Sequence, residues 1–444
     1  MENIRRIKIL EGWVRDQEML RARIDSGIEL SRKSSVKIKV TDAAGKPIPG
    51  AKITLKQKTH DFKYGANIFL LDELPDEERN AEHRRIFAES FNLATVPFYW
   101  DTLEPVKGQP RYGKDSPKVY RRPAIDLCLE YCRENGIEPK AHCLVYDKFR
   151  PKWVPMDEQG ARDAYLARME NLAEHYADKI NMWEVTNETL FPINHNCTNS
   201  MFYMAKDHVE WSFAQAERLF PKNRLIINET QDNIFEMNFG TRSPYYMQID
   251  RLLRDGTRID GIGMQYHSFF KKELEESYIP TRYAPQFLLE VFDLYARFDK
   301  PMQITEMTIP CYDEGEAGQD LQAEILKCVY SMWFSMPLME AIVYWNVADG
   351  YTYVDPNSDW NENYYAGGLL NHDLSLKPAM QMIQTLFGKT WRTNLQTETG
   401  ADGSAWVRGF HGHYDVEITA GGTTQTVPLH IAKNGPKDCA LVVK

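Results

Sequence analysis

Residues 180–188, INMWEVTNE, form a short apolar run that ends in an amide and a carboxylate. A second stretch of this kind, PMQITEM at 301–307, carries a glutamate next to its last residue. Short apolar runs followed by polar residues are typical of strands that are buried on both faces of a parallel sheet. The two stretches therefore predict buried strands with Glu188 and Glu306 at their carboxyl ends.

Six further segments have the same character, and helical stretches separate them along the middle of the chain. This alternation indicates βα units and a parallel sheet. No glycine-rich GxGxxG or GxxxxGKS/T loop follows any of the strands, so a doubly wound nucleotide-binding fold has no support. Eight strands separated by helices favour an α/β fold of the closed (β/α)8 barrel type, a TIM barrel. The six further strands are predicted at 62–68, 93–96, 138–146, 225–229, 261–267 and 341–349.

The two ends of the chain have a different pattern, in which apolar and polar residues alternate as in half-buried strands. Neither end is long enough to bury a core by itself. We therefore expect residues 1–60, which begin with a helix, and residues 389–444 to combine into one small β-sandwich-like module beside a barrel formed by residues 61–388. The strand-like segments are 36–42, 51–57, 404–419, 425–432 and 439–444.

Three aromatic residues of the C-terminal segment, Trp406, Phe410 and Tyr414, recur at a spacing of four. On a single strand this spacing would place all three on one face. Such a stripe suits either a carbohydrate-binding surface or an apolar interface with the barrel, and we favour the interface.

The composition limits the partners of the protein. Its 444 residues are 43% hydrophobic and 26% charged, as is ordinary for a globular protein, and the formal net charge is −10. This charge argues against nucleic acid and anionic membranes as partners, because both attract clustered Lys and Arg. It is compatible with a neutral substrate such as a sugar.

The chain has few signs of a membrane or secretory location. No run of about 18 apolar residues predicts a membrane span. The charged N-terminal segment lacks the apolar region of a signal peptide, so we expect a cytoplasmic protein, or a secreted one whose signal has been removed. The seven cysteines are scattered without a CxxC pair and predict neither a zinc site nor a disulfide framework.

Polar side chains collect at the predicted carboxyl ends of the strands, which is where a barrel of this type builds its active site. Each one taken singly is more simply a hydrogen-bonded residue at a strand end. So many polar residues at one edge, two of them glutamates after apolar runs, favour a single cleft. The set comprises His142, Asp147, Asn187, Glu188, Asn228, Glu229, Gln265, His267, Glu306, Trp345 and Asp349.

Glu188 and Glu306 are the pair in this set that suits glycoside hydrolysis, which needs two carboxyl groups flanking one C–O bond. The groups stand about 5–5.5 Å apart in retaining enzymes and about 6.5–9.5 Å apart in inverting ones. The fourth and seventh strands lie on opposite sides of an eight-stranded barrel. Side chains at their ends can converge over its centre, so the shorter separation is compatible with the predicted fold.

Six stretches of the sequence, in the same order, resemble glycoside hydrolase family ten, the xylanase family of clan A. WEVTNE (183–188) resembles the strand that carries the acid/base of that family, and QITEM (303–307) resembles its nucleophile strand. The resemblance runs from about residue 62 to about residue 385 and implies a barrel that hydrolyses glycosides with retention. The other four stretches are 91–112, 141–154, 260–267 and 369–380.

The resemblance also implies roles for the residues of the site. Glu306 would attack the anomeric carbon, and Glu188 would protonate the leaving oxygen and then deprotonate the incoming water. Asn187 would hydrogen-bond the 2-hydroxyl of the sugar being cleaved, and Gln265 and His267 would orient Glu306.

Five further residues complete the predicted substrate-binding set. His142 would support the site from beneath, and Trp345 would form the floor of the sugar site. Tyr146 and Asp147 stand where the family has Trp-His, and Trp100 lies in the segment TVPFYWD. This segment replaces the family's TPENEMKWD and lacks its Glu, Asn and Lys, which argues against a plain endo-xylanase acting on long unsubstituted xylan.

We therefore expect a retaining, xylanase-like β-glycoside hydrolase that cleaves a β-linked xylo-oligosaccharide or a xylose-containing glycoside. One alternative is a hydrolase of small-molecule glycosides whose apolar aglycone contacts Phe98 and Tyr99, although these residues suit core packing equally well. A second alternative is a non-catalytic carbohydrate-binding relative, against which the retention of both glutamates argues. A third is a metal-dependent barrel hydrolase; no HExxH spacing supports it, and we expect neither a metal nor a cofactor.

Overall fold

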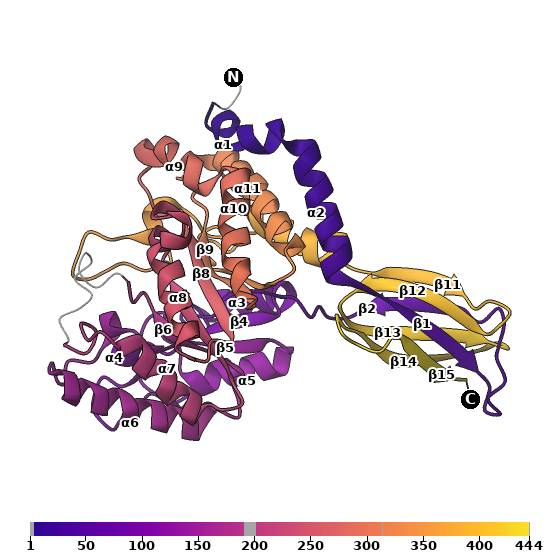
Figure 1. Cartoon of the computed structure of the whole chain (residues 1–444), viewed down its shortest axis with the longest axis horizontal. Helices are drawn as coiled ribbons and strands as arrows, with labels where there is room; N and C mark the ends of the chain where they lie inside the picture. The colour runs from indigo at the N-terminus through magenta and orange to yellow at the C-terminus, as the bar shows by residue number, and fades with distance from the viewer. Residues whose placement is uncertain (1–3, 191–200, 313, 444) are drawn as a thin grey trace. The chain divides into compact units, whose positions relative to one another are not determined.

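The chain divides into two compact units (Figure 1). The first comprises Met1–Arg15, Tyr64–Leu326 and Glu340–Met380, and the second comprises Asp16–Lys63, Lys327–Met339 and Gln381–Lys444. The structure is a computed structural model, and it describes residues 4–190, 201–312 and 314–443.

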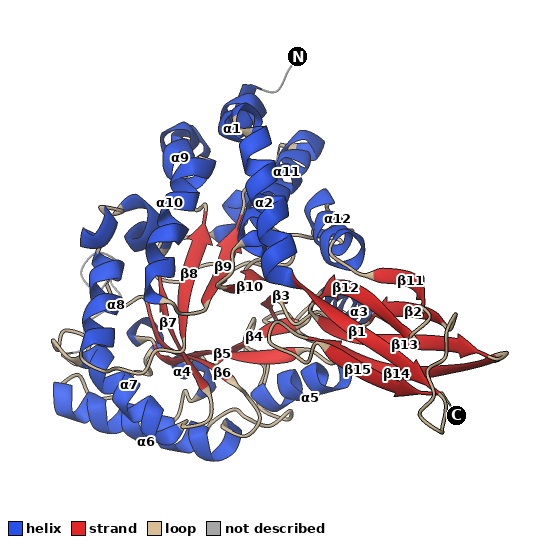
Figure 2. Ribbon diagram, turned by 45° about the vertical axis from the view of Figure 1, so that its right-hand side comes forward, coloured by secondary structure: helices blue, strands red, loops and turns tan. Residues whose placement is uncertain are grey.

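The first unit is built around a closed barrel of eight strands, in which each strand is hydrogen-bonded to the next along the chain and the last to the first. All eight predicted strands are present, which confirms the (β/α)8 fold. Figure 2 shows the barrel strands with helices around them. The strands are β3 (Lys63–Asn67), β4 (Leu93–Pro97), β5 (Glu138–Val145), β6 (Met182–Asn187), β7 (Arg224–Glu229), β8 (Gly261–His267), β9 (Met302–Thr308) and β10 (Met339–Tyr344).

A helix follows each barrel strand along the chain, as βα units require. The helices that follow the eight strands are α3 (Glu77–Ser90), α5 (Ile125–Asn135), α6 (Glu158–Tyr176), α7 (His208–Leu219), α8 (Pro244–Arg254), α10 (Pro285–Tyr295), α11 (Gly315–Ser335) and α12 (Pro378–Thr385). The others are α1 (Ile4–Arg15), α2 (Gln17–Arg32), α4 (Trp100–Leu103) and α9 (Glu275–Arg282). Asp76 and Asp157 start α3 and α6, because each carboxylate accepts a backbone N–H of the first turn at 2.8 Å.

Irregular pairing at the strand ends brings polar side chains together. The registers of β6 with β7 and of β8 with β9 both shift near the carboxyl ends of the strands. A bulge of this kind bends a strand and redirects the side chains next to it. Beyond the shifts, Asn187 is paired with Asn228 and Gln265 with Glu306, so four polar residues share one end of the barrel.

The second unit contains a three-stranded sheet, β12-β1-β15, and a four-stranded sheet, β11-β2-β13-β14. Both sheets combine strands from the two ends of the chain, as predicted. Apolar side chains of the two sheets form one buried core cluster, which includes Ile38, Ile53, Leu55 and Val416. The strands are β1 (Lys33–Thr41), β2 (Lys52–Gln57), β11 (Asn394–Glu398), β12 (Ser404–Phe410), β13 (Gly412–Ala420), β14 (Thr423–Ile431) and β15 (Asp438–Val442).

The prediction of one aromatic stripe in this unit was wrong. Trp406 and Phe410 belong to β12 of the three-stranded sheet, whereas Tyr414 lies on β13 of the four-stranded sheet, after a bend at His411. Trp406 is 62% exposed, but Tyr414 is 1% exposed and its hydroxyl donates to the Phe410 carbonyl at 2.6 Å. The spacing of four therefore crosses a bend instead of following one strand face.

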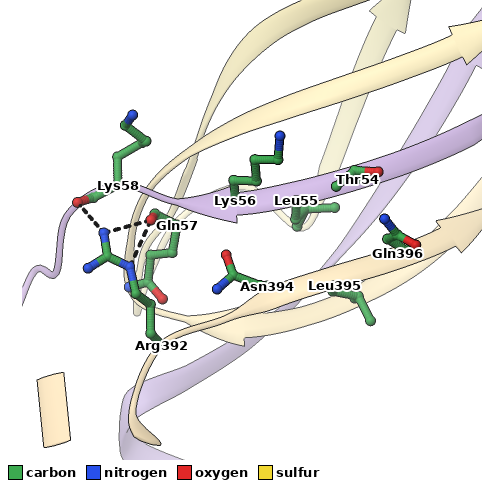
Figure 3. Close-up of a pocket in the computed structure, with 9 residues that line it drawn as sticks. All are labelled: Thr54, Leu55, Lys56, Gln57, Lys58, Arg392, Asn394, Leu395 and Gln396. Atoms are coloured by element: carbon green, nitrogen blue, oxygen red, sulfur yellow. Dashed lines mark hydrogen bonds between the residues drawn. The ribbon is translucent and has the colours of Figure 1, made fainter. Parts of the chain in front are cut away.

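A groove of about 530 Å³ lies over β2 and β11 of the four-stranded sheet (Figure 3). Arg392 closes one end, since its guanidinium donates to the Gln57 carbonyl at 2.7 Å and to the Lys58 carbonyl at 2.7 Å. The lining contains amides and cations but no carboxylate, so the groove lacks the acidic pair that glycoside hydrolysis needs. Its lining residues are Thr54, Leu55, Lys56, Gln57, Lys58, Arg392, Asn394, Leu395 and Gln396.

Two further features concern the described part of the chain. Within it, no helix is long and apolar enough to cross a membrane. None of the six cysteines in the described residues forms a disulfide bond, and two of them, Cys128 and Cys132, are buried on α5. The seventh, Cys197, lies outside the described residues.

Deleting residues 400–444, which removes β12 to β15, is expected to give insoluble protein. β1 would lose both neighbouring strands and β2 one of two, which would expose strand edges and the fully buried Ile38 and Ile53. Soluble yield and light scattering of the truncated and full-length proteins measure the effect. A truncated protein that is soluble and fully active would contradict this expectation.

Candidate active site

One amide nitrogen connects the two glutamates predicted from the sequence. Gln265 Nε2, on β8, lies 3.0 Å from Glu188 Oε1 and 3.1 Å from Glu306 Oε1. These two oxygens therefore lie no farther apart than the sum of those distances, 6.1 Å. Two carboxyl oxygens this close favour the roughly 5–5.5 Å between the carboxyl groups of retaining glycosidases over the about 6.5–9.5 Å of inverting ones. We call Glu188 and Glu306 the acidic pair.

Three N–H groups face the carboxylate of Glu306, which is 4% exposed. Asn228 Nδ2 and Gln265 Nε2 each lie 3.1 Å from Oε1, and His267 Nε2 lies 3.1 Å from Oε2. Burial lowers the pKa of His267 to about 4, so the ring is neutral at pH 7. Its Nδ1 lies 3.1 Å from the Thr308 hydroxyl, and when that hydroxyl donates, the ring proton is on Nε2 and faces Glu306.

Glu188 is held at the point where β6 ends. Its Oε2 accepts a hydrogen bond from the Tyr146 hydroxyl at 2.5 Å, and its backbone N–H donates to the Asn228 carbonyl at 3.2 Å. The φ angle of Glu188 is +54°, a left-handed conformation that is uncommon for a residue other than glycine. Strain of this kind persists where surrounding contacts fix the backbone, and it is concentrated at functional sites.

Glu229, at the end of β7, fixes the residues that follow Glu188. Its Oε2 accepts the Leu190 backbone N–H at 3.0 Å and lies 3.4 Å from the Thr189 hydroxyl. Burial raises the pKa of Glu229 to about 7, and the charge of Glu188 adds to this effect, whereas hydrogen bonds from backbone N–H groups oppose it. The sequence placed Glu229 among the strand-end polar residues but assigned it no role.

A buried ion cluster of Lys140, His142 and Glu184 comes from β5 and β6. Glu184 accepts hydrogen bonds from Lys140 Nζ and from His142 Nδ1, at 2.5 Å each, and all three side chains are at most 1% exposed. Burial alone would raise the pKa of Glu184, but the charges of Lys140 and His142 outweigh it and lower this pKa to about 2. Burial opposes the charged form of His142, but the charge of Glu184 outweighs it and raises the pKa.

The ion cluster lies next to the acidic pair. His142, Glu184 and Glu306 place one nitrogen or oxygen atom each within 4.8 Å of one another. Three such ligands could surround a metal ion, but the ammonium of Lys140 already supplies a cation to Glu184. This contact favours an ion cluster over the metal-dependent alternative. Lys140 and Glu184 were not predicted; the available signal was a charge within an otherwise apolar strand.

The pKa of Glu306 is raised to about 8. Burial is the largest cause, the charges of Glu184 and Glu188 add to it, and the positive charge of His142 lowers the pKa. The three N–H groups around the carboxylate favour its ionised form and oppose the effect of burial. His142 and these donors therefore shift Glu306 towards its ionised form, the form in which a carboxylate can act as a nucleophile.

Trp345, predicted as the floor of the sugar site, packs with Phe69 and Tyr99 in a small buried aromatic cluster. The Trp345 ring centroid lies 5.2 Å from the Phe69 ring centroid. It lies 5.4 Å and 6.1 Å from the ring centroids of His142 and His267. Contacts with both histidines place the Trp345 ring beside the acidic pair. Asn187 also reaches the site, since its Oδ1 lies 3.4 Å from the Gln265 amide nitrogen.

Asp147 and Trp100 make their described contacts elsewhere. Asp147 Oδ1 lies 3.2 Å from the Tyr165 hydroxyl and 3.3 Å from Arg150 Nε. Trp100 packs against Trp153 and Tyr165, with ring centroids 5.4 Å and 4.9 Å apart. The structure therefore places these two candidates against α6 and the loop before it, whereas the other six gather around the acidic pair.

The fold and the acidic pair together define a class of protein, a (β/α)8 barrel with two carboxyl groups spaced for glycoside hydrolysis. Residues 61–386 match Glycosyl hydrolase family 10, and the chain belongs to this family. The match confirms the resemblance found in the sequence.

Known relatives are similar at low identity. The chain is 25% identical over 399 residues to Anti-sigma-I factor RsgI6 of Acetivibrio thermocellus, an alignment that covers 88% of this chain and 45% of that protein. It is 25% identical over 303 residues to Endo-1,4-beta-xylanase B of Thermotoga neapolitana, which covers 66% of this chain and 79% of that protein. The chain thus spans less than half the length of the first of these relatives.

Among solved structures, native xylanase 10B from Thermotoga maritima superimposes with a TM-score of 0.57 at 21% identity, covering 74% of this chain and 96% of that one. The structure of GH10 from Paenibacillus barcinonensis gives a TM-score of 0.56 at 18% identity, covering 75% and 97% of the two chains. At these identities the likeness establishes a shared barrel fold.

Replacing Lys140 by Met is expected to destabilise the protein by about 3–5 kcal/mol, because it removes one of the two described cationic partners of buried Glu184. The double variant Lys140→Met, Glu184→Gln removes both charges and is expected to be closer to wild type in stability. Denaturant unfolding of the full chain measures both. An equal loss in the single and double variants would show that charge balance is not the cause.

Proposed function

We propose that the protein is a retaining β-glycoside hydrolase that cleaves a β-linked xylo-oligosaccharide or a xylose-containing glycoside. The observation that carries this proposal is the shared Gln265 donor, which keeps one oxygen of Glu188 within 6.1 Å of one oxygen of Glu306 and so favours the spacing of a retaining pair. Family membership supports hydrolysis of a glycosidic bond. The xylanase names of several relatives support a substrate that contains xylose.

In the first step, an ionised oxygen of Glu306 attacks the anomeric carbon while the bond to the leaving oxygen breaks. The electron pair of that bond stays with the leaving oxygen, which takes the proton of Glu188. The sugar is then an ester of Glu306, and Glu188 is a carboxylate. Tyr146 and Gln265 each contact one oxygen of Glu188 and hold it beside the leaving group.

In the second step, water takes the place of the leaving group. Glu188 accepts one of its protons as the water oxygen bonds to the anomeric carbon and the ester bond to Glu306 breaks. Glu306 leaves with its electron pair, so both glutamates return to their starting states. Two displacements at one carbon retain its β configuration.

The segment after β4 gives little support to an apolar aglycone as the leaving group. Phe98 is 1% exposed and packs against Tyr176 and Trp183, with ring centroids 5.7 Å and 5.2 Å away. The ring of Tyr99 is covered by the Arg122 guanidinium, whose carbon lies 3.9 Å from the ring centroid. Phe98 is therefore core, and Tyr99 is buried beside Trp345, so neither presents an exposed apolar surface to an aglycone. This favours the xylose-containing substrate over the small-molecule glycoside.

Glu306→Ala and Glu188→Ala test the roles of the acidic pair on an aryl β-xylobioside and on xylo-oligosaccharides. Glu306→Ala is expected to abolish turnover of both. Glu188→Ala is expected to lower kcat on xylo-oligosaccharides about 10²–10⁴-fold, and to slow the first step less on the aryl substrate, whose leaving group needs no proton. The exposed Glu174→Ala, on α6, is the matched control and should behave as wild type.

If wild type and both variants of the acidic pair hydrolyse these substrates alike, the catalytic assignment is wrong and a carbohydrate-binding relative is favoured. A proton-NMR time course adds the stereochemistry. The β-anomer of the product should appear first, and initial release of the α-anomer would refute retention.

The pH dependence of kcat/KM tests the electrostatics of Glu306. Because Glu306 must be ionised, kcat/KM should fall as the pH drops through its pKa, which burial raises to about 8, well above the ordinary range of a glutamate. His142→Gln removes a positive charge that lowers this pKa, so the acid limb should move about 1 unit or more to higher pH. The exposed His175→Gln is the control, and an acid limb in His142→Gln that stays or moves down would overturn the interpretation.

A further inference from the structure

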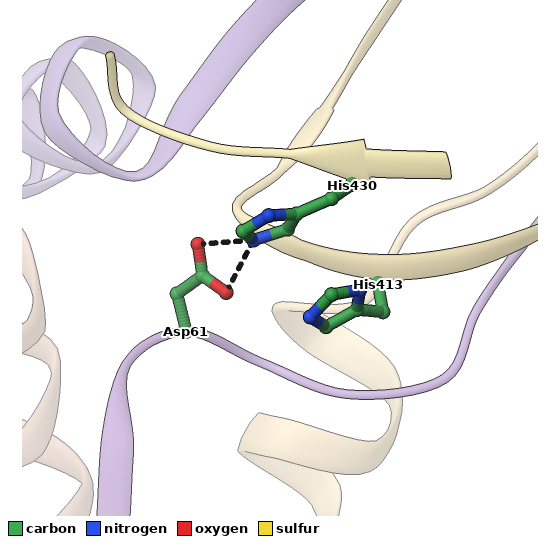
Figure 4. Close-up of side chains that lie close together, drawn as sticks. All are labelled: Asp61, His413 and His430. Atoms are coloured by element: carbon green, nitrogen blue, oxygen red, sulfur yellow. Dashed lines mark hydrogen bonds and ion pairs between the residues drawn. The ribbon is translucent and has the colours of Figure 1, made fainter. Parts of the chain in front are cut away.

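Two histidines and an aspartate lie close together in the second unit, outside the barrel site (Figure 4). They are Asp61, in the segment between β2 and β3, His413 on β13 and His430 on β14. Each offers one ligand atom, and these atoms lie within 4.8 Å of one another. Figure 4 shows the two imidazole rings one above the other, with His430 pointing at the carboxylate of Asp61.

The register of the hairpin fixes the two imidazoles as neighbours. His413 and His430 are directly paired on antiparallel β13 and β14, so they project from the same face of the sheet. The residues next to them, Tyr414 and Leu429, are buried in the core, which leaves both histidines on the outer, solvent-exposed face. Their rings stack with centroids 4.1 Å apart and planes inclined by 13°.

The backbone around Asp61 is held to the same hairpin. Its N–H donates to the His411 carbonyl at 3.1 Å, and the N–H of Lys58 donates to the His413 carbonyl at 2.7 Å. Both oxygens of Asp61 then lie within hydrogen-bond distance of His430 Nε2, at 2.9 Å and 3.0 Å. The carboxylate therefore stands in front of the imidazole pair before any ligand arrives.

We propose that Asp61, His413 and His430 bind one divalent transition-metal ion, with Zn²⁺ the ion that the ligand set fits best. Two imidazole nitrogens and a carboxylate oxygen are ligands that zinc prefers, whereas Ca²⁺ and Mg²⁺ prefer oxygen alone. Bonds of about 2.0–2.1 Å in a tetrahedron separate neighbouring ligand atoms by roughly 3.3 Å. Water completes the coordination at this exposed position.

Zinc coordination requires the stacked rings to separate, because a metal ion lies near the plane of each imidazole that binds it. The Asp61–His430 contact needs to open by only a few tenths of an ångström for an ion to lie between the two atoms. The His413 nitrogen has to approach by up to about 1.5 Å from the 4.8 Å limit, and an exposed side chain can do this by rotation. The proton that His430 Nε2 shares with Asp61 passes to solvent when the ion binds.

The ion would act as a clip within the second unit. It would join Asp61, in the segment that leads from β2 to β3, to two strands of the C-terminal part of the chain. Cross-links between positions far apart in sequence restrict the unfolded chain more than local ones. Binding to the folded protein alone would raise its thermal stability in proportion to the logarithm of the ion concentration.

The test is titration of the full-length protein, freed of metal by chelation, with ZnCl₂ in a calorimeter. Wild type is expected to bind one ion per chain, and His413→Gln and His430→Gln to bind at least tenfold more weakly. The exposed His175→Gln, on α6, should bind as wild type. CaCl₂ and MgCl₂ should give no comparable binding. Co²⁺ in place of zinc should give visible absorption that both glutamine variants lose.

Thermal unfolding provides the second measurement. Zn²⁺ should raise Tm in wild type and in His175→Gln but not in His430→Gln, and the three proteins should have similar Tm values without metal. Equal zinc affinity in wild type and in the double variant His413→Gln, His430→Gln would overturn the proposal, as would no stoichiometric binding by wild type.

Discussion

Charge balance beneath the mouth of the barrel is the constraint on which the site depends. Glu184 and Glu306 are buried and Glu188 is half-buried beside them, so three carboxyl groups lie close together, and Lys140 and His142 supply two positive charges. A buried charge without a partner costs several kcal/mol. The group is neutral when one proton is shared between Glu188 and Glu306. One acid and one carboxylate is also the state from which the proposed double displacement would start.

Neutral groups hold the acidic pair in place. Gln265 donates to both glutamates, and Asn228 donates to Glu306 through its side chain and accepts from Glu188 through its carbonyl. A cation between the two carboxyl groups would favour ionisation of both and leave no proton for the leaving group. Amides fix the separation without this effect. The positive charges of the ion cluster act from one side, where they reach Glu306 through space.

The barrel strands and the acidic pair could be predicted because each strand is an apolar run that ends in polar residues. The ion cluster could not, since a charge such as Lys140 or Glu184 within a strand does not reveal its partner on the next one. The aromatic stripe failed because a bend separates Tyr414 from β12. The pairing of His413 with His430 depends on the register of one hairpin, which turn geometry fixes and the sequence pattern does not.

The joining of both chain ends in the same sheets has a consequence for biosynthesis. β2 ends at Gln57, and the first of its partners, β11, begins at Asn394. At about 5–20 residues per second, a ribosome needs roughly 15–70 s to translate the stretch between them. Because β1 and β2 belong to different sheets, they cannot satisfy each other's backbone hydrogen bonds during this time. Until then the nascent chain carries β1 and β2 without their partner strands. A chaperone that binds these two strands would have to stay bound until the C-terminal strands have been synthesised.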